Sequence, residues 1–320
     1  MRRVVVTGMG ALTPVGNTVE EFWSNLVKGV GGCDMITRFD TENFKTKFAC
    51  ELKNFDAAEH FDRKEARKLD RYAQYGLVAA DEAYRSAGLA DANIDKDRAG
   101  VIWASGIGGI ETFKDEIENY VEGGRLPRFN PFFIPKMIGD IAAGQISIKY
   151  GYRGPNYGTV SACASSTNAL IDAYNLIRLD MADLIIAGGS EAAINQAGIG
   201  GFNSLQALST NNEEYKTASR PFDATRDGFV IGEGGGGLIL EELEHAIRRG
   251  ATIYAELIGG GLSADAYHIT APHPDGEGAM LVMRNALRDA GIAPEEIDYI
   301  NVHGTATPLG DLSETRAIKK

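Results

Sequence analysis

Short apolar runs that end in glycine recur along the chain. Residues 4–6, 101–104 and 184–187 are each rich in apolar side chains, which is typical of strands buried on both faces. Between such runs, segments such as 72–88 place apolar residues at helical spacing. The pattern predicts an α/β protein, and the 39 glycines suit its tight strand-to-helix turns.

Part of this pattern occurs twice. The helix end at 83–89 is repeated at 286–292, and each copy is followed by a polar linker and an apolar run, at 101–104 and at 299–302. The parsimonious explanation is one α/β unit that has been duplicated.

The duplication sets the expected domain boundary. A strand-like run at 252–258 echoes the opening strand, so we place a first half over residues 1–250 and the start of a second half over residues 251–320. Nothing after Lys320 corresponds to the remaining elements of the first copy. We therefore expect the second half to be incomplete and the natural chain to continue beyond this residue.

Composition narrows the class of protein. The 320 residues carry a net charge of −12, which argues against a general nucleic-acid binder. The three cysteines, Cys33, Cys50 and Cys163, form no even framework and have no metal-like spacing, so we expect a reducing compartment and no metal site. No apolar run approaches the roughly 20 residues of a membrane span, and the chain starts with a strand-like run rather than a signal peptide. These features predict a soluble, cytoplasmic protein.

Two glycine-rich segments could suggest nucleotide binding. The first, around Gly8 and Gly10, has Thr13 where a dinucleotide fingerprint needs a third glycine. The second, at 232–237, is not followed by the Gly-Lys-Ser/Thr of a phosphate loop. We reject both sites, and interpret the second segment as backbone that lies close to other backbone.

The stretch 158–166 carries the main chemical signal. It begins with branched residues typical of a strand, turns through small residues, and continues from Ser166 to Asp180 as a predicted helix. Cys163 would therefore lie at a strand-to-helix junction, where the partial positive charge of the first-turn N–H groups favours a thiolate. The alternative is a small buried cysteine at a tight turn.

A second motif begins at His303, directly after the apolar run 299–302. The carboxyl end of a strand is where open α/β sheets bind ligands. Thr305 and Thr307 alternate along an extended segment, so their hydroxyls could face the same side. The histidine could act as the polar partner of the Cys163 nucleophile, or it could be a core residue satisfied by a carbonyl.

A dense basic cluster occupies residues 62–71. Helical spacing would place Lys64, Arg67, Lys68 and Arg71 on one side of a helix. Such a cluster is either a solvated face with internal ion pairs or a docking patch for an acidic partner.

These motifs together resemble the condensing enzymes of the thiolase fold, and most of all the beta-ketoacyl-acyl-carrier-protein synthases II of dissociated fatty acid synthesis. The likeness rests on Ser-Ala-Cys-Ala-Ser-Ser around Cys163 and on His-Gly-Thr-Ala-Thr-Pro-Leu-Gly-Asp from His303, 140 residues apart, and it runs along the whole chain. It implies a duplicated, layered αβαβα architecture, of which the second half would here be truncated.

The resemblance also implies a reaction. Cys163 would accept an acyl chain from acyl carrier protein as a thioester. His303 would assist decarboxylation of the malonyl thioester on a second carrier and stabilise the enolate, whose carbanion attacks the acyl group. In the family a second catalytic His, a Lys and a Gly-Phe loop follow, and they would lie beyond residue 320.

Further roles follow from the resemblance alone. Thr305 and Thr307 would bind the phosphopantetheine arm, Ile107 and Phe202 would line the acyl pocket, and the carrier would dock on Lys64, Arg67 and Lys68. No cofactor is implied, because the phosphopantetheine arrives on the carrier protein. The family also implies a homodimer.

Three other functions remain to be weighed. A polyketide-type ketosynthase shares the same motifs. A non-catalytic, carrier-binding scaffold is disfavoured because both Cys163 and His303 are retained, and chain-length factors lack the cysteine. A cysteine hydrolase could use the same two residues as a dyad.

Overall fold

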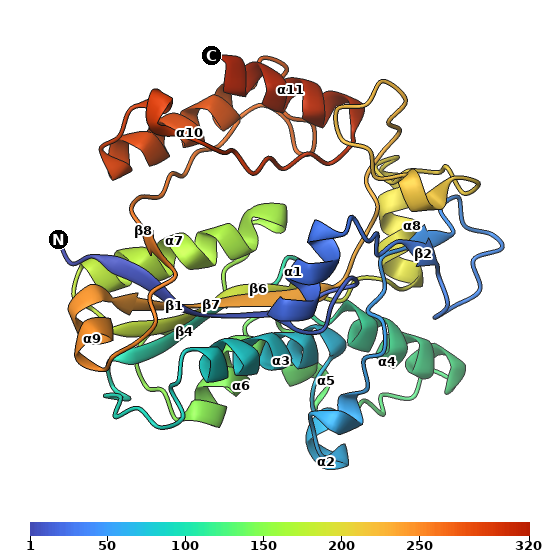
Figure 1. Ribbon diagram of the computed structural model, residues 1–320. Coiled ribbons are helices and arrows are strands. Elements are labelled where there is room, and N and C mark those ends of the chain that lie inside the picture. Colours follow the sequence, from blue (N-terminus) through green and yellow to red (C-terminus); the bar gives the residue numbers. More distant parts are fainter. The chain divides into compact units, whose positions relative to one another are not determined.

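The computed structural model describes all 320 residues. The chain forms two compact units, and each is described by itself (Figure 1). The first unit comprises residues 1–32, 50–198 and 232–257, and the second comprises 33–49, 199–231 and 258–320.

A six-stranded mixed sheet is the centre of the first unit. Its strand order is β5-β4-β6-β7-β1-β8, with β4 parallel to β5 and β6 and the other pairs antiparallel. The strands are β1 (Val4–Leu12), β4 (Ala99–Ala104), β5 (Asn156–Tyr157), β6 (Leu184–Glu191), β7 (Gly234–Glu242) and β8 (Ala255–Leu257). The three predicted apolar runs are thus confirmed as strands, and every residue of β4 is buried.

Helices cover both faces of this sheet. In Figure 1, α7 lies on one face and α3 and α6 lie on the other. Each face has its own apolar core, one built around Trp103 and Tyr72 and the other around Ile102 and Ile177. The helices of the unit are α1 (Val19–Val27), α2 (Arg63–Ala66), α3 (Arg71–Ser86), α4 (Ile110–Glu122), α5 (Phe133–Met137), α6 (Ile141–Tyr150), α7 (Ser165–Arg178) and α9 (Leu243–Arg248), with short 3-10 turns at Ala57–Glu59 and Ala162–Ala164.

The glycine-rich segments are sites of close packing. A Cβ at Gly10 would lie 1.9 Å from the carbonyl oxygen of Ala79, so only glycine lets α3 approach β1 this closely. A Cβ at Gly237 would lie 2.8 Å from the Trp103 ring. The run 232–237 enters β7 at Gly234, where a Cβ would lie 2.3 Å from the backbone carbonyl oxygen of Leu12, so the prediction that this backbone lies close to other backbone is confirmed.

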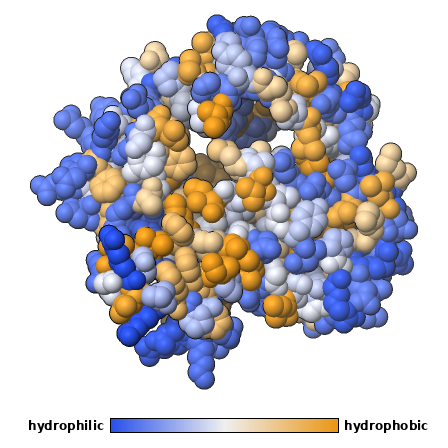
Figure 2. Space-filling view, turned by 180° about the vertical axis from the view of Figure 1, so that it is seen from behind, coloured by the Kyte–Doolittle hydropathy of each residue, from blue (hydrophilic) through white to orange (hydrophobic).

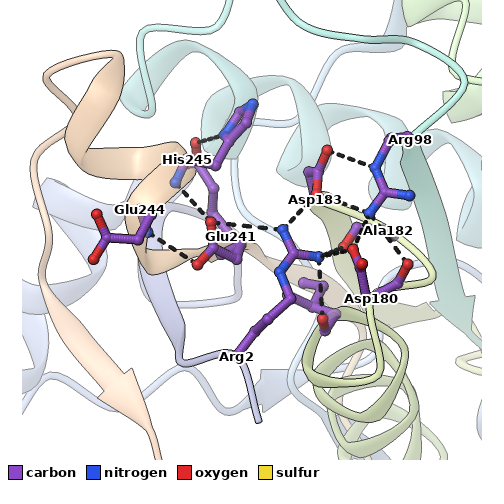
Figure 3. A network of polar contacts seen from close by, with 10 residues as sticks. Arg2, Arg98, Asp180, Ala182, Asp183, Glu241, Glu244 and His245 are labelled. Atoms are coloured by element: carbon purple, nitrogen blue, oxygen red, sulfur yellow. Dashed lines mark hydrogen bonds and ion pairs between the residues drawn. The ribbon is translucent and has the colours of Figure 1, made fainter.

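An ionic network fixes the start of β1 to the segment before β6 (Figure 3). Arg2 pairs with Asp180 at 2.8 Å and with Asp183 at 2.5 Å. Arg98 binds the same two carboxylates, at 2.6 Å and 2.7 Å. Two guanidinium groups therefore share two carboxylates, which balances charge at this edge of the sheet.

Beside this network lies a fully buried carboxylate, Glu241 of β7. It accepts hydrogen bonds from Thr7 and from both ends of the Arg249 guanidinium, each at 2.7 Å, and it contacts His245. Burial raises the pKa of Glu241, but these partners outweigh burial and the pKa is lowered overall. The carboxylate is thus held ionised inside the fold.

The second unit has little regular sheet. It contains the two-stranded pair β2 (Asp34–Met35) and β3 (Phe48–Ala49), the helices α10 (Glu277–Ala290) and α11 (Pro308–Lys319), and the 3-10 turns Tyr215–Thr217 and Pro294–Glu296, while α8 (Gln196–Ser204) spans the point where the chain enters it. The repeated helix ends share one feature, a glycine in the left-handed region. Gly88 and Gly291, each shortly after its helix, both have positive φ, at 64° and 71°.

Two predicted strands are wrong. Residues 158–160 form no strand, because the pairing of β5 with β4 ends at Tyr157 and Thr159 instead donates to the carbonyl of Ser165. Residues 299–302 also form no strand: the side chain of Tyr299 is 79% exposed. The backbone that follows is held by a side chain, Glu314, rather than by a neighbouring strand.

Apolar side chains also occur on the surface. Figure 2 shows apolar residues gathered in patches between polar ones on the face in view. In the first unit they are frequent on α4 and the segment after it, where Phe113, Val121, Leu126 and Phe129 are exposed. Helices long and apolar enough to cross a bilayer are absent from the structure.

Candidate functional site

Cys163 lies in a 3-10 turn, Ala162–Ala164, that leads directly into α7. Its side chain is exposed, which excludes the alternative of a buried structural cysteine. The helix begins one residue before the predicted start, but the preceding strand ends at Tyr157 rather than at the cysteine. The thiol therefore stands at the amino-terminal end of a 14-residue helix, where the helix dipole favours a thiolate.

The turn before the cysteine is strained and firmly held. Ala162 has a φ of +50°, which a residue with a Cβ adopts only at a cost. The hydroxyl of Ser165 accepts from the N–H of Ser161 at 2.9 Å and donates to the carbonyl of Ala162 at 2.6 Å. Asn168 of α7 donates to the Ser161 hydroxyl at 2.7 Å. These bonds fix the backbone on both sides of the strained residue.

A second turn, residues 105–108, lies against the cysteine turn. It follows β4, whose parallel neighbour β6 ends at the same edge of the sheet, with Ala104 paired to Gly189. A Cβ at Gly106 would lie 3.4 Å from the carbonyl oxygen of Ala162. The turn carries Ile107, whose side chain is 44% exposed. The structure thus brings Ile107 and Cys163 onto adjacent turns.

Glu191, the last residue of β6, holds this second turn. Its carboxylate accepts from the Ser105 hydroxyl at 2.9 Å and from the backbone N–H groups of Gly106 and Ile107 at 2.8 Å and 3.1 Å. Burial raises the pKa of Glu191, although these hydrogen bonds oppose the shift. Sequence reasoning missed this residue; the available signal was an acidic residue two positions after the apolar run that ends at Gly189.

In the second unit, His303 is exposed at the start of a tightly held loop. The Glu314 carboxylate accepts from the N–H of His303 at 2.7 Å and from that of Gly304 at 2.9 Å. The hydroxyl oxygens of Thr305 and Thr307 lie 2.9 Å apart, which confirms that they face the same side. The loop thus presents an imidazole and two neighbouring hydroxyls in sequence.

Asp311 of α11 braces the same loop. It is buried, and it accepts from the N–H of Ala306 at 3.1 Å and from that of Phe222 at 2.7 Å. Arg226 lies 3.1 Å from its second oxygen and also donates to the carbonyl of Pro308 at 2.8 Å. Arg226 thereby ties the loop that contains it to α11, which is far away in the sequence.

The remaining predicted residues are distributed over both units. Phe202, on α8, packs edge-on against Phe229 with ring centroids 5.3 Å apart. The basic cluster is not one continuous helix, because α2 ends at Ala66 and Arg71 begins α3, where it pairs with Glu111 at 3.1 Å. The interruption arises because Asp70 caps the amino-terminal end of α3.

Three residues of the predicted basic face remain on α2 and the turn after it. Lys64 and Arg67 are exposed, and Lys68 is partly buried and pairs with Glu65 at 2.6 Å. Arg71 is not part of the predicted basic face, because it lies on α3 and pairs with Glu111. Lys64 and Arg67 are therefore exposed cations, whereas Lys68 takes part in an ion pair within the cluster.

Comparison with known families identifies two matching regions. Residues 1–246 match the family described as "Beta-ketoacyl synthase, N-terminal domain", and residues 254–320 match "Beta-ketoacyl synthase, C-terminal domain". The sequence is 51% identical over 318 residues to 3-oxoacyl-[acyl-carrier-protein] synthase 2 of Staphylococcus aureus, which covers 99% of this chain and 76% of the relative. It is 47% identical over 319 residues to the protein of the same name from Synechocystis sp., with coverage of 100% and 76%.

Solved structures of similar fold come from the same kind of enzyme as these relatives. A beta-ketoacyl synthase from Burkholderia phymatum matches with a TM-score of 0.91 and 35% identity, over 99% of this chain and 77% of that chain. A type II polyketide ketosynthase, solved with its acyl carrier protein, matches with a TM-score of 0.90 and 36% identity, over 99% and 77%. The fold is accordingly thiolase-like.

Proposed function

Since this chain belongs to the beta-ketoacyl synthase family, we propose that it is a 3-oxoacyl-[acyl-carrier-protein] synthase of type II fatty acid biosynthesis, an acyltransferase that condenses malonyl-carrier protein with a cysteine-bound acyl chain. The observation that carries the proposal is the exposed cysteine on a strained turn at the start of α7. The Cys163 turn and the His303 loop are the two parts of the chain that we assign to catalysis.

Cys163 is the proposed nucleophile for the first half of the reaction. Its thiolate attacks the thioester carbonyl of an acyl chain carried on phosphopantetheine, and the carrier thiolate leaves as the acyl group passes to the cysteine. The partial positive charge at the start of α7 supports the ionised form. The backbone N–H of Cys163 is our candidate donor to the oxygen on which negative charge develops.

His303 is the proposed residue of the malonyl half. It donates a hydrogen bond to the thioester carbonyl while the carboxylate of the malonyl group leaves as carbon dioxide, and the bonding electrons form an enolate. The carbanion carbon then attacks the acyl group on Cys163 and releases the cysteine thiolate. The anchoring of the His303 and Gly304 backbone by Glu314 supports a fixed position for this imidazole.

Binding of the substrates is assigned to three further sets of residues. Thr305 and Thr307 present paired hydroxyls that suit the polar phosphopantetheine arm. Ile107 and Phe202 are the proposed apolar residues of the acyl pocket. The acidic carrier protein is proposed to dock through Lys64, Arg67 and Lys68.

Other properties belong to the same proposal. The enzyme needs no cofactor of its own, since the prosthetic group arrives on the carrier protein. We place it in the cytoplasm and take it to act as a homodimer, which suits the apolar side chains exposed on α4. We also propose that the two thiolase-like halves divide at residues 250 and 251.

A polyketide-type ketosynthase is the second candidate. It is favoured by the 36% identity to a ketosynthase of that type, whereas the relatives at 51% and 47% identity are named as 3-oxoacyl-carrier-protein synthases. The two activities differ in product, because a polyketide enzyme extends chains whose keto groups have been kept.

Mass spectrometry of the protein after incubation with acyl-carrier protein tests the proposal. A mass increase of one acyl group on the peptide that contains Cys163, absent in Cys163→Ser, is the expected result. Addition of malonyl-carrier protein should then give carbon dioxide and a 3-oxoacyl-carrier product, and His303→Ala should retain acylation but lose decarboxylation. No acyl group on Cys163 would favour the non-catalytic scaffold, and release of free fatty acid without malonyl-carrier protein would favour a hydrolase.

A further inference from the structure

Glu191 is a partly buried carboxylate that the proposed reaction does not use. It ends β6 at the edge of the sheet where β4 also ends, and it has three neutral donors from one short turn: the Ser105 hydroxyl and the N–H groups of Gly106 and Ile107. Two consecutive backbone N–H groups bound to one oxygen fix the orientation of both peptide planes. The position of the Ile107 backbone therefore depends directly on this carboxylate.

The turn is closed on its other side as well. The Ser105 hydroxyl, while donating to Glu191, accepts from the N–H of Gly108 at 2.9 Å. Gly109 then donates to the carbonyl of Met137 at 3.0 Å, just before α4 begins. The chain from β4 to α4 thus has no long flexible stretch, and the backbone on both sides of Ile107 is held by hydrogen bonds.

Gly106 separates the carboxylate from the cysteine turn. A Cβ built on it would lie 2.9 Å from the Glu191 carboxylate and 3.4 Å from the carbonyl oxygen of Ala162, the residue before Cys163. No side chain fits between them without movement of one or the other. The turn that carries Ile107 therefore packs directly against the turn that carries Cys163.

We propose that Glu191 is a positioning residue that sets which acyl chains the enzyme transfers to Cys163, by fixing the turn that carries Ile107. The inference rests on the proposed function, in which Ile107 lines the acyl pocket. Glu191 does not itself touch the acyl chain. It holds the backbone from which an apolar side chain reaches the acyl chain, so its loss changes the shape of the pocket rather than the chemistry of the thiol.

The test compares long and short acyl donors. The measured quantity is the ratio of kcat/KM for acylation of Cys163 by a C12 and a C4 acyl-carrier protein, because this ratio does not depend on how much of a variant is folded. We expect Glu191→Ala to change the ratio at least about tenfold, a change on the scale of pocket discrimination between chains. Glu191→Gln should stay within about threefold, since an amide oxygen can accept both N–H groups and its NH₂ can donate to the Ser105 hydroxyl.

A double variant shows whether the effect passes through Ile107. In the Ile107→Ala background, Glu191→Ala should no longer change the ratio, because the side chain that it positions is absent. The matched control is Glu242→Ala, which removes a buried carboxylate that accepts from the N–H groups of Glu244 and His245 at 3.1 Å and 2.8 Å, at the opposite end of β7. It should leave the ratio unchanged even if it lowers the melting temperature.

The outcomes separate this inference from the proposed function. If the unchanged enzyme takes no acyl group from either donor, the proposed function fails and the inference fails with it. If the unchanged enzyme is acylated but Glu191→Ala slows both donors by one common factor, or still changes the ratio in the Ile107→Ala background, the inference alone is wrong. Should Glu191→Ala fail to fold, Ser105→Ala replaces it. A smaller change of the kcat/KM ratio that disappears in the Ile107→Ala background supports the inference. An unchanged ratio overturns it.

Discussion

Arg226 Nε lies 3.1 Å from Asp311 Oδ2, and this ion pair joins segments that are 85 residues apart in the sequence. The same carboxylate accepts from the N–H groups of Phe222 and Ala306. One buried acid therefore holds the loop around residue 222, the loop that begins at His303, and the first turn of α11. The relationship makes the geometry of the proposed malonyl site depend on a side chain that takes no part in the chemistry.

Removal of this acid should impair the His303 loop selectively. Asp311→Ala leaves the Arg226 guanidinium and two N–H groups without their shared partner, at a cost of about 3 kcal/mol in the free energy of unfolding. We expect decarboxylation of malonyl-carrier protein to fall at least about tenfold, on the scale of a misplaced reacting group, while acylation of Cys163 by the folded fraction is retained. Urea unfolding and the two half-reactions measured separately give these values.

Arg316→Ala is the control for this variant. Arg316 is on the same helix, but it is exposed and its nearest carboxylate, that of Asp275, is 3.9 Å away. It should cost less than about 1 kcal/mol and leave both half-reactions intact. Equal losses of acylation and decarboxylation in Asp311→Ala would show that the acid supports the whole fold rather than this loop.

Reversal of charge on the basic cluster should weaken carrier binding without affecting the chemistry. In the variant with Lys64, Arg67 and Lys68 all changed to Glu, KM for acyl-carrier protein should rise at least about tenfold at low salt, with little change in kcat. The difference from the unchanged enzyme should shrink as salt screens the charges. Steady-state kinetics at several salt concentrations measure both effects.

The control for charge reversal is an exposed cation elsewhere in the first unit. Arg248→Glu, on α9, alters net charge without touching the cluster. If KM for acyl-carrier protein in this variant rises by about the amount that each single reversal contributes in the triple variant, then the overall charge of the enzyme, rather than a local patch, governs carrier binding. An unchanged KM in the triple variant would remove the docking assignment.

The ionic network around Arg98 should make stability depend on pH in acid. The hydrogen bond from Arg98, helped by Arg2 and opposed by burial, lowers the pKa of Asp183 to about 2 from its ordinary 3.8. A carboxyl with a lowered pKa stabilises the fold above its unfolded pKa, and this contribution is lost as pH falls from about 4 through about 2. Asp183→Asn should cost about 1 kcal/mol at neutral pH, discounted for partial exposure, and should flatten the acid slope in that window. Denaturant unfolding between pH 7 and pH 2 tests this.

The exposed Asp298 provides the comparison. Asp298→Asn should leave the acid slope as it is in the unchanged protein. If Asp183→Asn shows the same slope as Asp298→Asn, the network contributes nothing to acid stability.

The sequence was sufficient to predict features that depend on residues close together in the chain. Apolar runs identified β1, β4 and β6, and the small residues before Ser166 placed Cys163 at the start of a helix, because these signals are local. The run 299–302 misled for the same reason: its apolar residues predict a strand whether or not a partner strand pairs with it.

The rest depends on contacts that sequence spacing does not encode. Nothing near Glu191 indicates that its partners are Ser105 to Ile107, more than 80 residues earlier, and the same is true of Arg226 and Asp311. The break in the basic cluster was also missed, since Asp70 looked like one more charged residue on a helix until the structure showed it as a cap. Polar groups that fix a loop are chosen by the fold that surrounds them, which pattern alone does not reveal.

The strained residue before the nucleophile gives the last prediction. Ala162 has a φ of +50°, which costs an alanine about 1–2 kcal/mol relative to ordinary backbone. Ala162→Gly removes that strain but adds freedom to the unfolded chain, so the free energy of unfolding should rise by no more than about 1 kcal/mol. The turn becomes less well fixed at the same time, and acylation of Cys163 should slow by about three- to tenfold. Ala164→Gly, at a φ of −85°, is the matched control: it relieves no strain and should lose about 0.5–1 kcal/mol. If the two glycine variants lose the same stability, the strain at Ala162 is absent in solution; if Ala162→Gly acylates as fast as the unchanged enzyme, the strain has no part in holding the thiol.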